Sequence, residues 1–245
     1  MNATPAEQQE LLRLQSVDTR LAQLAHRLGT LPQAAPLAEL AGRDDALRRS
    51  RAEAVGVLED VRTELSRLES DVSLVEARIA RDGDRLTHTS SVKDVTALES
   101  ELASLARRRS DLEDQELVVM ERVEEAENAV ASLDAQRADL ASERTRLEAE
   151  RDEAAAGLAT DRDQAERDRQ VIASTIPAEL LAFYERLRVR GGGIGAALLR
   201  QRTCGGCTIT LTGSDLETVR RASANDVLQC PECDRILVRT EESGI

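Results

Sequence analysis

Aromatic residues are nearly missing from this chain of 245 residues. It has one Phe, one Tyr and no Trp, so aromatics make up 1% of the sequence. A globular core of this size normally contains several large rings, each of which buries roughly 150–250 Å². Ala, Glu, Leu, Arg and Asp dominate instead, a composition typical of coiled coils and long helices. We therefore expect no globular core in most of the chain.

Long apolar runs are missing too. No stretch approaches the roughly 18 apolar residues of a membrane-spanning helix. The N-terminal sequence MNATPAEQQELLRL has neither the basic start nor the apolar segment of a signal peptide. All four cysteines occur in CxxC pairs, which favours reduced thiols in the cytoplasm. These features predict a cytoplasmic protein that does not contact a membrane.

Catalytic signatures are also lacking. The sequence contains no P-loop, no GxSxG and no GxGxxG after a strand. The two histidines, His26 and His88, lie far apart and are interpreted as ordinary surface residues. The many carboxylates are most simply a solvated helix face. We therefore do not expect an enzyme or a small-molecule substrate.

The net charge of −13 is unevenly distributed. Residues 176–245 contain nine Arg and nine Asp or Glu, so the whole excess of negative charge lies on residues 1–175. An acidic stretch repels phosphate backbones and keeps an extended protein soluble. If nucleic acid binds, the C-terminal segment is the expected place.

Apolar residues recur at alternating spacings of three and four, the pattern of a coiled-coil seam. Three runs cover residues 14–31, 37–86 and 95–172, and two prolines interrupt the helix at 32–36. Charged residues also occupy seam positions, where arginine stems can cover the seam while their heads reach water. These positions are Asp44, Arg51, Asp82, Arg109, Glu116, Arg137, Arg144 and Arg151.

Residues 5–86 and 93–174 are equally long, which favours a chain that reverses near residue 89. The predicted fold is mainly α: a long kinked antiparallel coiled-coil hairpin at 1–175, with its kink at 32–36 and its tip at about 87–94. An intramolecular hairpin of this kind satisfies the seam without a partner, so dimerisation is not required. The alternative folds the first helix back on the second as a three-helix bundle.

The tip has no apolar periodicity, and Ser91-Val92-Lys93-Asp94 resembles a capping box that restarts a helix. Lys93 is the only lysine in the chain. A plain spacer or dimerising coil is the simplest interpretation of the rod. At its end, however, Ser91, Lys93 and Asp94 are candidates for contact with a protein partner.

Two CxxC pairs, separated by 22 residues, predict a C4 zinc ribbon at 204–245. Their thiolates would complete a tetrahedral shell around one structural Zn²⁺, with no open position for catalysis. The predicted ligands are Cys204, Cys207, Cys230 and Cys233. Strands are expected at 208–212 and 236–238, with a helix from Gly213 to about Ala222. A thioredoxin-like redox site would need one CxxC on a βαβ framework, and paired disulfides would need an export signal.

Three patches resemble a family of bacterial coiled-coil proteins with a C-terminal C4-type zinc ribbon, long catalogued as having unknown function. The tip matches the family motif Asn-Asn-Lys-Glu-Tyr-x-Ala-Leu-x-x-Glu at Lys93, Ala97, Leu98 and Glu101. It departs from the motif at Ser91-Val92 and Val95. The segment 176–188 is similar to the hinge helix of the family, and the ribbon carries Asp234 where Gly is usual. The resemblance implies the hairpin and ribbon fold, and in some relatives a role in transcriptional or flagellar regulation through a sigma factor and messenger RNA.

Two functions follow for the C-terminal part, in which a hinge helix and a Gly-rich linker at 176–203 precede the ribbon. One is nucleic-acid binding, RNA or DNA, in transcription or post-transcriptional regulation. Its candidate residues are Arg186, Arg188, Arg190, Arg200, Arg202, Arg220, Arg221 and Arg235. The alternative is a protein scaffold or chaperone-like adaptor, for example for a sigma factor, with the glycines at 191–195 as a flexible joint. We expect Phe183 and Tyr184 to pack between the rod end and the ribbon.

Overall fold

The computed structural model describes all residues, 1–245, and divides them into two compact units. One unit, here the ribbon unit, combines Met1–Ala34 with Ala149–Ile245. The other, here the hairpin unit, is Ala35–Glu148. Each unit contains part of α3 (Val92–Thr175), the longest helix of the chain.

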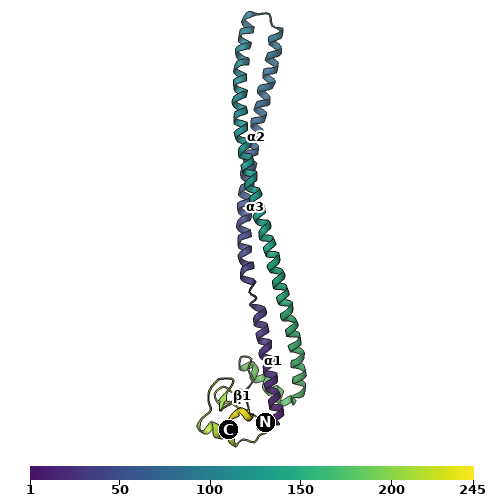
Figure 1. Ribbon diagram of the computed structural model, residues 1–245, viewed down its shortest axis with the longest axis vertical. Coiled ribbons are helices and arrows are strands. Elements are labelled where there is room, and N and C mark those ends of the chain that lie inside the picture. Colours follow the sequence, from purple (N-terminus) through teal and green to yellow (C-terminus); the bar gives the residue numbers. More distant parts are fainter. The chain divides into compact units, whose positions relative to one another are not determined.

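The hairpin unit consists of α2 (Ala34–His88) and the first part of α3, which lie side by side and antiparallel (Figure 1). Cross-helix ion pairs fix their register, including Asp44 with Arg137 at 3.1 Å and Arg78 with Glu101 at 2.8 Å. The seam buries apolar side chains at the spacing that the sequence predicts. These include Leu40, Leu58, Val61, Leu112, Val119, Ala126 and Leu140. The predicted antiparallel coiled-coil hairpin is confirmed.

In the ribbon unit, α1 (Pro5–Gly29) lies along the last part of α3. Leu24 packs with Leu158 and Ala165, and Asp18 pairs with Arg169 at 2.6 Å. The first helix therefore pairs with the third, and the three-helix bundle with α1 folded back on α2 is wrong. The break between α1 and α2 covers only residues 30–33, because Pro36 is accommodated in the first turn of α2, where its missing N–H costs nothing.

The first four residues form an edge on the ribbon that the sequence did not predict. Ala3 donates its N–H to the carbonyl of Asn225 at 2.8 Å, and Val227 donates to the carbonyl of Met1 at 3.1 Å. Thr4 then caps α1 in a capping box with Glu7. The N-terminus is thereby tied to the segment before β3.

The sheet has the order β2-β1-β4-β3. Its strands are β1 (Ala196–Arg200), β2 (Thr203–Cys204), β3 (Leu228–Gln229) and β4 (Ile236–Val238). β1 is parallel to β4, whereas β2 and β3 are antiparallel to their neighbours. The module therefore starts at Ala196, upstream of the first cysteine.

Around this sheet, α4 (Ala178–Arg190) precedes β1, α5 (Gly213–Arg221) follows the first cysteine pair, and η1 (Glu241–Ser243) ends the chain. The expected helix from Gly213 and the strand at 236–238 are confirmed. The expected strand at 208–212 is wrong. Thr208 adopts a φ of 62°, which turns the backbone, and only a single bridge joins Thr203 to Thr210.

One hydrophobic core joins α1, α4 and the sheet. It contains Ala3, Leu11, Leu14, Ile176, Leu180, Tyr184, Leu187, Ala196, Ile236 and Val238. Tyr184 is completely buried there, and Phe183 packs at the edge. The two aromatics lie between the helices and the ribbon, as the sequence suggests.

The segment 191–195 is a fixed turn, so its interpretation as a flexible joint is wrong. Gly195 donates its N–H to Oε1 of Gln15 at 2.7 Å, and the carbonyl of Gly191 accepts from Arg235 at 3.0 Å. A Cβ at Gly195 would lie 2.7 Å from the carbonyl oxygen of Tyr184. Glycine is needed here for close packing rather than for mobility.

Candidate metal centre and ribbon surface

The four cysteines meet at one point of the ribbon unit. Their Sγ atoms all lie within 4.8 Å of one another. The Sγ atoms of Cys204 and Cys233 are 3.9 Å apart, and those of Cys207 and Cys230 are 3.8 Å apart. Tetrahedral Zn–S bonds of about 2.3 Å place sulfurs roughly 3.8 Å from each other. The cluster therefore fits one structural Zn²⁺ held by four thiolates.

The two knuckles share one hydrogen-bond pattern. Cys204 donates its N–H to the carbonyl of Ile209, and its own carbonyl accepts from Thr208. Cys230 repeats this with Arg235 and Asp234. The fourth residue after the first cysteine of each pair is left-handed, with φ of 62° at Thr208 and 58° at Asp234. Neither is glycine, so both knuckles carry backbone strain at the same place.

The glycines between Cys204 and Cys207 serve close approach rather than unusual torsion. A Cβ on Gly206 would lie 2.7 Å from Cδ of Arg235 and 3.1 Å from Cβ of Ala197. A Cβ on Gly205 would lie 3.1 Å from the carbonyl oxygen of Leu198.

The thiols differ in how readily they ionise in the metal-free chain. Burial raises the pKa of Cys230 to about 12 and also raises the pKa of Cys204. Burial opposes ionisation of Cys233 as well, but hydrogen bonds from the backbone and side chain of Arg235 outweigh it and lower the pKa of that thiol. Zinc binds thiolates and displaces these protons, so the metal is coupled to the fold of the module.

A buried polar network holds α1 against α4 and the turn before β1. The Tyr184 hydroxyl lies 2.7 Å from Oδ2 of Asp18, to which it donates, and 3.1 Å from Oε1 of Gln15. Gln15 also donates to the carbonyl of Gly193 at 3.0 Å. Burial is the main reason that the pKa of Tyr184 is raised, so its hydroxyl stays protonated. In the sequence, nothing distinguishes Gln15 and Asp18 from other polar residues on an amphipathic helix.

Charged residues complete the network at its edge. Arg169 donates to Asp18 and to Glu185, and Arg188 pairs with Glu185 at 2.8 Å. These hydrogen bonds, chiefly the one to Asp18, raise the pKa of Arg169, which stays charged. Arg188 also lies 3.5 Å from Oδ2 of Asp18, so these two arginines balance the charges of the two carboxylates, Asp18 and Glu185.

The structure divides the eight arginines proposed for nucleic acid. Arg235 donates hydrogen bonds to three backbone carbonyls of the ribbon unit, those of Gly191, Ile194 and Gly206. Four others pair with carboxylates: Arg188, Arg200, Arg220 and Arg221. The remaining three, Arg186, Arg190 and Arg202, are exposed and have no carboxylate within ion-pair distance. The eight side chains do not act as one group.

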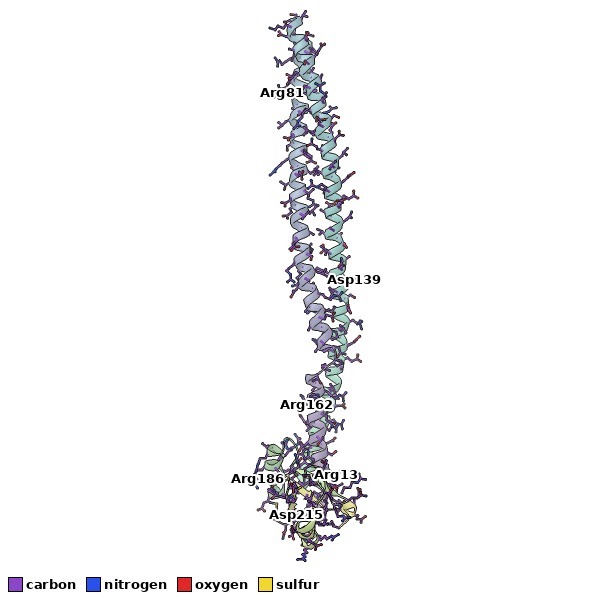
Figure 2. The ribbon with its side chains drawn as sticks, turned by 90° about the vertical axis from the view of Figure 1, so that its left-hand side faces the viewer. Arg13, Arg81, Asp139, Arg162, Arg186 and Asp215 are labelled. Carbon is purple, nitrogen blue, oxygen red and sulfur yellow. The ribbon has the colours of Figure 1, made fainter.

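The outer face of α4 holds two of the unpaired arginines. An open groove of about 630 Å³ is lined by Phe183, Glu185, Arg186, Leu187, Val189, Arg190 and Gln229. The guanidinium of Arg186 lies 5.5 Å from the centre of the Phe183 ring. Val189 is 76% exposed. Arg186 is labelled in Figure 2, at the margin of the ribbon unit.

Ser91 lies between α2 and α3, whereas Lys93 and Asp94 lie in the first turn of α3. The carbonyl of Ser91 accepts from Val95 at 2.9 Å, but its hydroxyl makes no hydrogen bond, so the expected capping box is not formed. Lys93 is exposed and has no ion pair, and Val92 is 82% exposed. Asp94 lines a shallow hollow with Arg85 and His88, among others.

None of the helices combines the length and apolar character needed to span a membrane.

Comparisons with known proteins agree with this architecture. Residues 14–192 match the CT398-like coiled coil hairpin domain, and residues 203–237 match the C4-type zinc ribbon domain. An uncharacterised protein of Mycobacterium tuberculosis is 37% identical over 246 residues, covering 98% of both chains. An uncharacterised protein of Mycobacterium leprae is 29% identical, covering 91% of this chain and 96% of the relative.

Solved structures give the same result. A Mycobacterium smegmatis structure aligns with a TM-score of 0.85 at 34% identity, covering 98% of this chain and all of that one. CT398 from Chlamydia trachomatis aligns with a TM-score of 0.63 at 21% identity, covering 96% and 98%, which supports the fold alone. Together with the paired helices and the four clustered thiols, these matches place the chain in the family of CT398-like coiled-coil hairpin proteins, with a C4-type zinc ribbon at its C-terminal end.

Proposed function

We propose that this zinc-binding protein is an adaptor whose ribbon unit binds nucleic acid through Arg186, Arg190 and Arg202. One observation carries the proposal: these three exposed guanidinium groups have no carboxylate partner, although the chain has 46 acidic residues. Arginines that are already paired gain little from a phosphate, since they must first give up an ion pair. Unpaired arginines can replace the counterions of a nucleic acid directly.

Zinc and the hairpin have separate roles in this proposal. The metal holds β2 and the knuckles, and with them the turn that carries Arg202. The acidic hairpin would repel nucleic acid, which leaves it for a protein partner, with Ser91, Lys93 and Asp94 as the contact at its tip. Such an adaptor would act in transcription or post-transcriptional regulation.

The test is fluorescence-anisotropy binding of the zinc-loaded protein to labelled RNA and DNA at low and moderate salt. The variant Arg186→Glu/Arg190→Glu/Arg202→Glu removes the unpaired set. The matched control Arg200→Glu/Arg220→Glu/Arg221→Glu makes the same change in net charge at paired positions. We expect the first variant to lose binding and to flatten the salt dependence by roughly one unit of slope for each phosphate that is no longer bound.

The alternative is a protein scaffold or chaperone-like adaptor, for example for a sigma factor, without nucleic-acid binding. The exposed Val92 and the unpaired Lys93 favour it, because a solvated apolar residue beside a free charge suits a protein contact. Absence of binding at low salt would support this alternative. Equal losses in both triple variants would mean that net charge matters and the three chosen arginines do not.

A further inference from the structure

The groove on α4 is positively charged in spite of the acidic residue that lines it. Glu185 is bound by Arg169 and Arg188, so its charge is neutralised within the ribbon unit. Arg186 and Arg190 remain, one turn apart on the exposed face of the helix. A ligand in this groove therefore meets two unpaired guanidinium groups and no free carboxylate.

The groove is partly apolar, since Phe183, Leu187 and Val189 line it. The guanidinium of Arg186 lies over the ring of Phe183 at 5.5 Å, and Phe183 itself packs against the core formed by α1, α4 and the sheet. This contact engages the guanidinium without using its hydrogen bonds, and the Arg186 side chain remains exposed. Val189, 76% exposed, extends the apolar surface along the helix.

We propose that this groove binds a single-stranded segment of nucleic acid, with one unpaired base stacked on the Arg186–Phe183 pair and a neighbouring phosphate on Arg190. The inference rests on the proposed nucleic-acid function and narrows its ligand. Aromatic rings and guanidinium planes are the usual stacking partners of unpaired bases in proteins.

The preference for a single strand follows from geometry. In a duplex both faces of every internal base are covered by its neighbours, so no base is free to stack on a protein surface. Phosphates on a duplex could still contact Arg190 and Arg202, but Arg186 and Phe183 would then contribute charge and bulk only. An acidic protein segment with an apolar side chain would also match the charges, but it would not need a planar guanidinium.

The experiment compares labelled oligo(U) RNA and oligo(dT) of about 12 nucleotides with a duplex of the same length. It uses the zinc-loaded full chain and two conservative variants. Arg186→Lys keeps the charge but removes the plane. Phe183→Leu keeps an apolar contact with the core but removes the ring. Arg221→Lys, on the exposed face of α5, is the matched control. Zinc content and a thermal melt verify that each variant is folded.

We expect the single strands to bind more tightly than the duplex. Arg186→Lys should weaken single-strand binding by roughly fivefold to a hundredfold, the usual range for removal of a base stack, with an unchanged salt slope. Duplex binding and the Arg221→Lys control should be unaffected. Phe183→Leu should act in the same direction because the guanidinium then loses its support.

Three results would overturn the inference. If single strands and duplex bind equally and Arg186→Lys changes nothing, the stacking site is wrong while the triple Glu variant can still uphold nucleic-acid binding. If poly-glutamate competes as well as oligo(U) and also binds the Arg186→Lys variant, the groove is a site for an acidic protein segment. If no oligonucleotide binds at low salt, the proposed function itself fails.

Discussion

The ribbon unit and the hairpin unit are stabilised in different ways. In the ribbon unit, side chains such as Leu11 and Tyr184 are completely buried, and hydrogen bonds join residues more than 150 positions apart. In the hairpin unit, contacts repeat along two helices, and ion pairs such as Arg62 with Glu127 remain about half exposed at 55% and 49%. A repeated seam shares its stability over many small contacts, whereas the ribbon unit depends on a few specific ones.

This difference predicts how each unit responds to a single change. Removing one exposed ion pair from the hairpin leaves the other contacts in place, because each exposed pair contributes little. Removing one partner in the ribbon unit leaves a buried group without its hydrogen bond or a metal without its ligand. The following predictions test this contrast in order of decreasing effect.

Removal of zinc should have the largest effect. Cys230→Ser takes away one ligand, and structural zinc contributes on the order of 10–16 kcal/mol in small zinc peptides. We expect the β-sheet and the knuckles to unfold while α2 and the paired part of α3 stay helical. Limited proteolysis followed by mass spectrometry would map cleavage to 196–245, with circular dichroism reporting the remaining helix. A chelator should reproduce the result and added zinc should reverse it in the wild type only. Cleavage spread evenly over the whole chain would contradict the contrast between the units.

Loss of the buried hydroxyl at Tyr184 should come second. Tyr184→Phe keeps the ring but removes the donor that Gln15 and Asp18 share. Gln15 keeps its hydrogen bond from Gly195 and Asp18 keeps that from Arg169, so the expected cost is that of one lost hydrogen bond to a charged group, roughly 1.5–3 kcal/mol. Urea unfolding of the zinc-loaded protein would measure it. Arg13→Ala is the control, since the ion pair of Arg13 with Glu10 is exposed. An unchanged midpoint in Tyr184→Phe would show that the network adds nothing to stability.

The hairpin could be predicted from the sequence because its contacts are periodic. A seam spacing of three and four residues specifies both the helix and its buried face, and two arms of equal length specify the turn. The four zinc ligands could be predicted equally well, because the spacing within and between CxxC pairs is specific to this kind of metal site. These parts depend on short-range patterns that the chain repeats.

The rest of the ribbon unit depends on contacts without a local pattern. Nothing in the order of residues indicates that Gln15 would reach the turn at Gly193–Gly195, or that Ala3 would pair with Asn225. Arg235 looked like any basic residue on a polar surface, yet it holds three backbone carbonyls. The sequence also gives the number of charged residues but not which of them form ion pairs. Only the structure shows that Arg186, Arg190 and Arg202 lack the carboxylate partners that neighbouring arginines have.

Relief of strain in the knuckles should have a smaller effect and a positive one. Thr208 and Asp234 occupy equivalent left-handed positions. A β-branched residue tolerates this conformation worse than Asp does, and glycine tolerates it best. We expect Thr208→Gly to stabilise the zinc-loaded protein by about 0.5–1 kcal/mol and Asp234→Gly by less, since the αL penalty is partly offset by the flexibility of glycine in the unfolded chain. Thermal melts of both variants would measure this change in stability. Gly213→Ala is the control in the opposite direction, because it replaces glycine at another left-handed position. A larger gain at Asp234 would reverse the proposed order of strain.

The smallest expected effect is the response of the hairpin unit to acid. A hydrogen bond from Arg137 is the main reason that the pKa of Asp44 lies below its ordinary value of 3.8, and Arg51 lowers the pKa of Asp134 in the same way. A carboxyl group with a lowered folded pKa stabilises the fold above its ordinary pKa, and this stabilisation disappears as the pH falls through the folded value. The Asp134 side chain is 45% exposed and that of Asp44 is 24% exposed, so water reaches both groups and each contribution is small and screened by salt. Thermal melts at falling pH should therefore show a slight loss of helix stability below pH 3.8 that is weaker in Asp44→Asn and in high salt. A steep acid transition at higher pH, unaffected by salt, would mean that the hairpin depends on a buried charge, for which Asp82, 7% exposed and paired with Arg78 and Arg85, is the candidate. The contrast between the two units would then disappear.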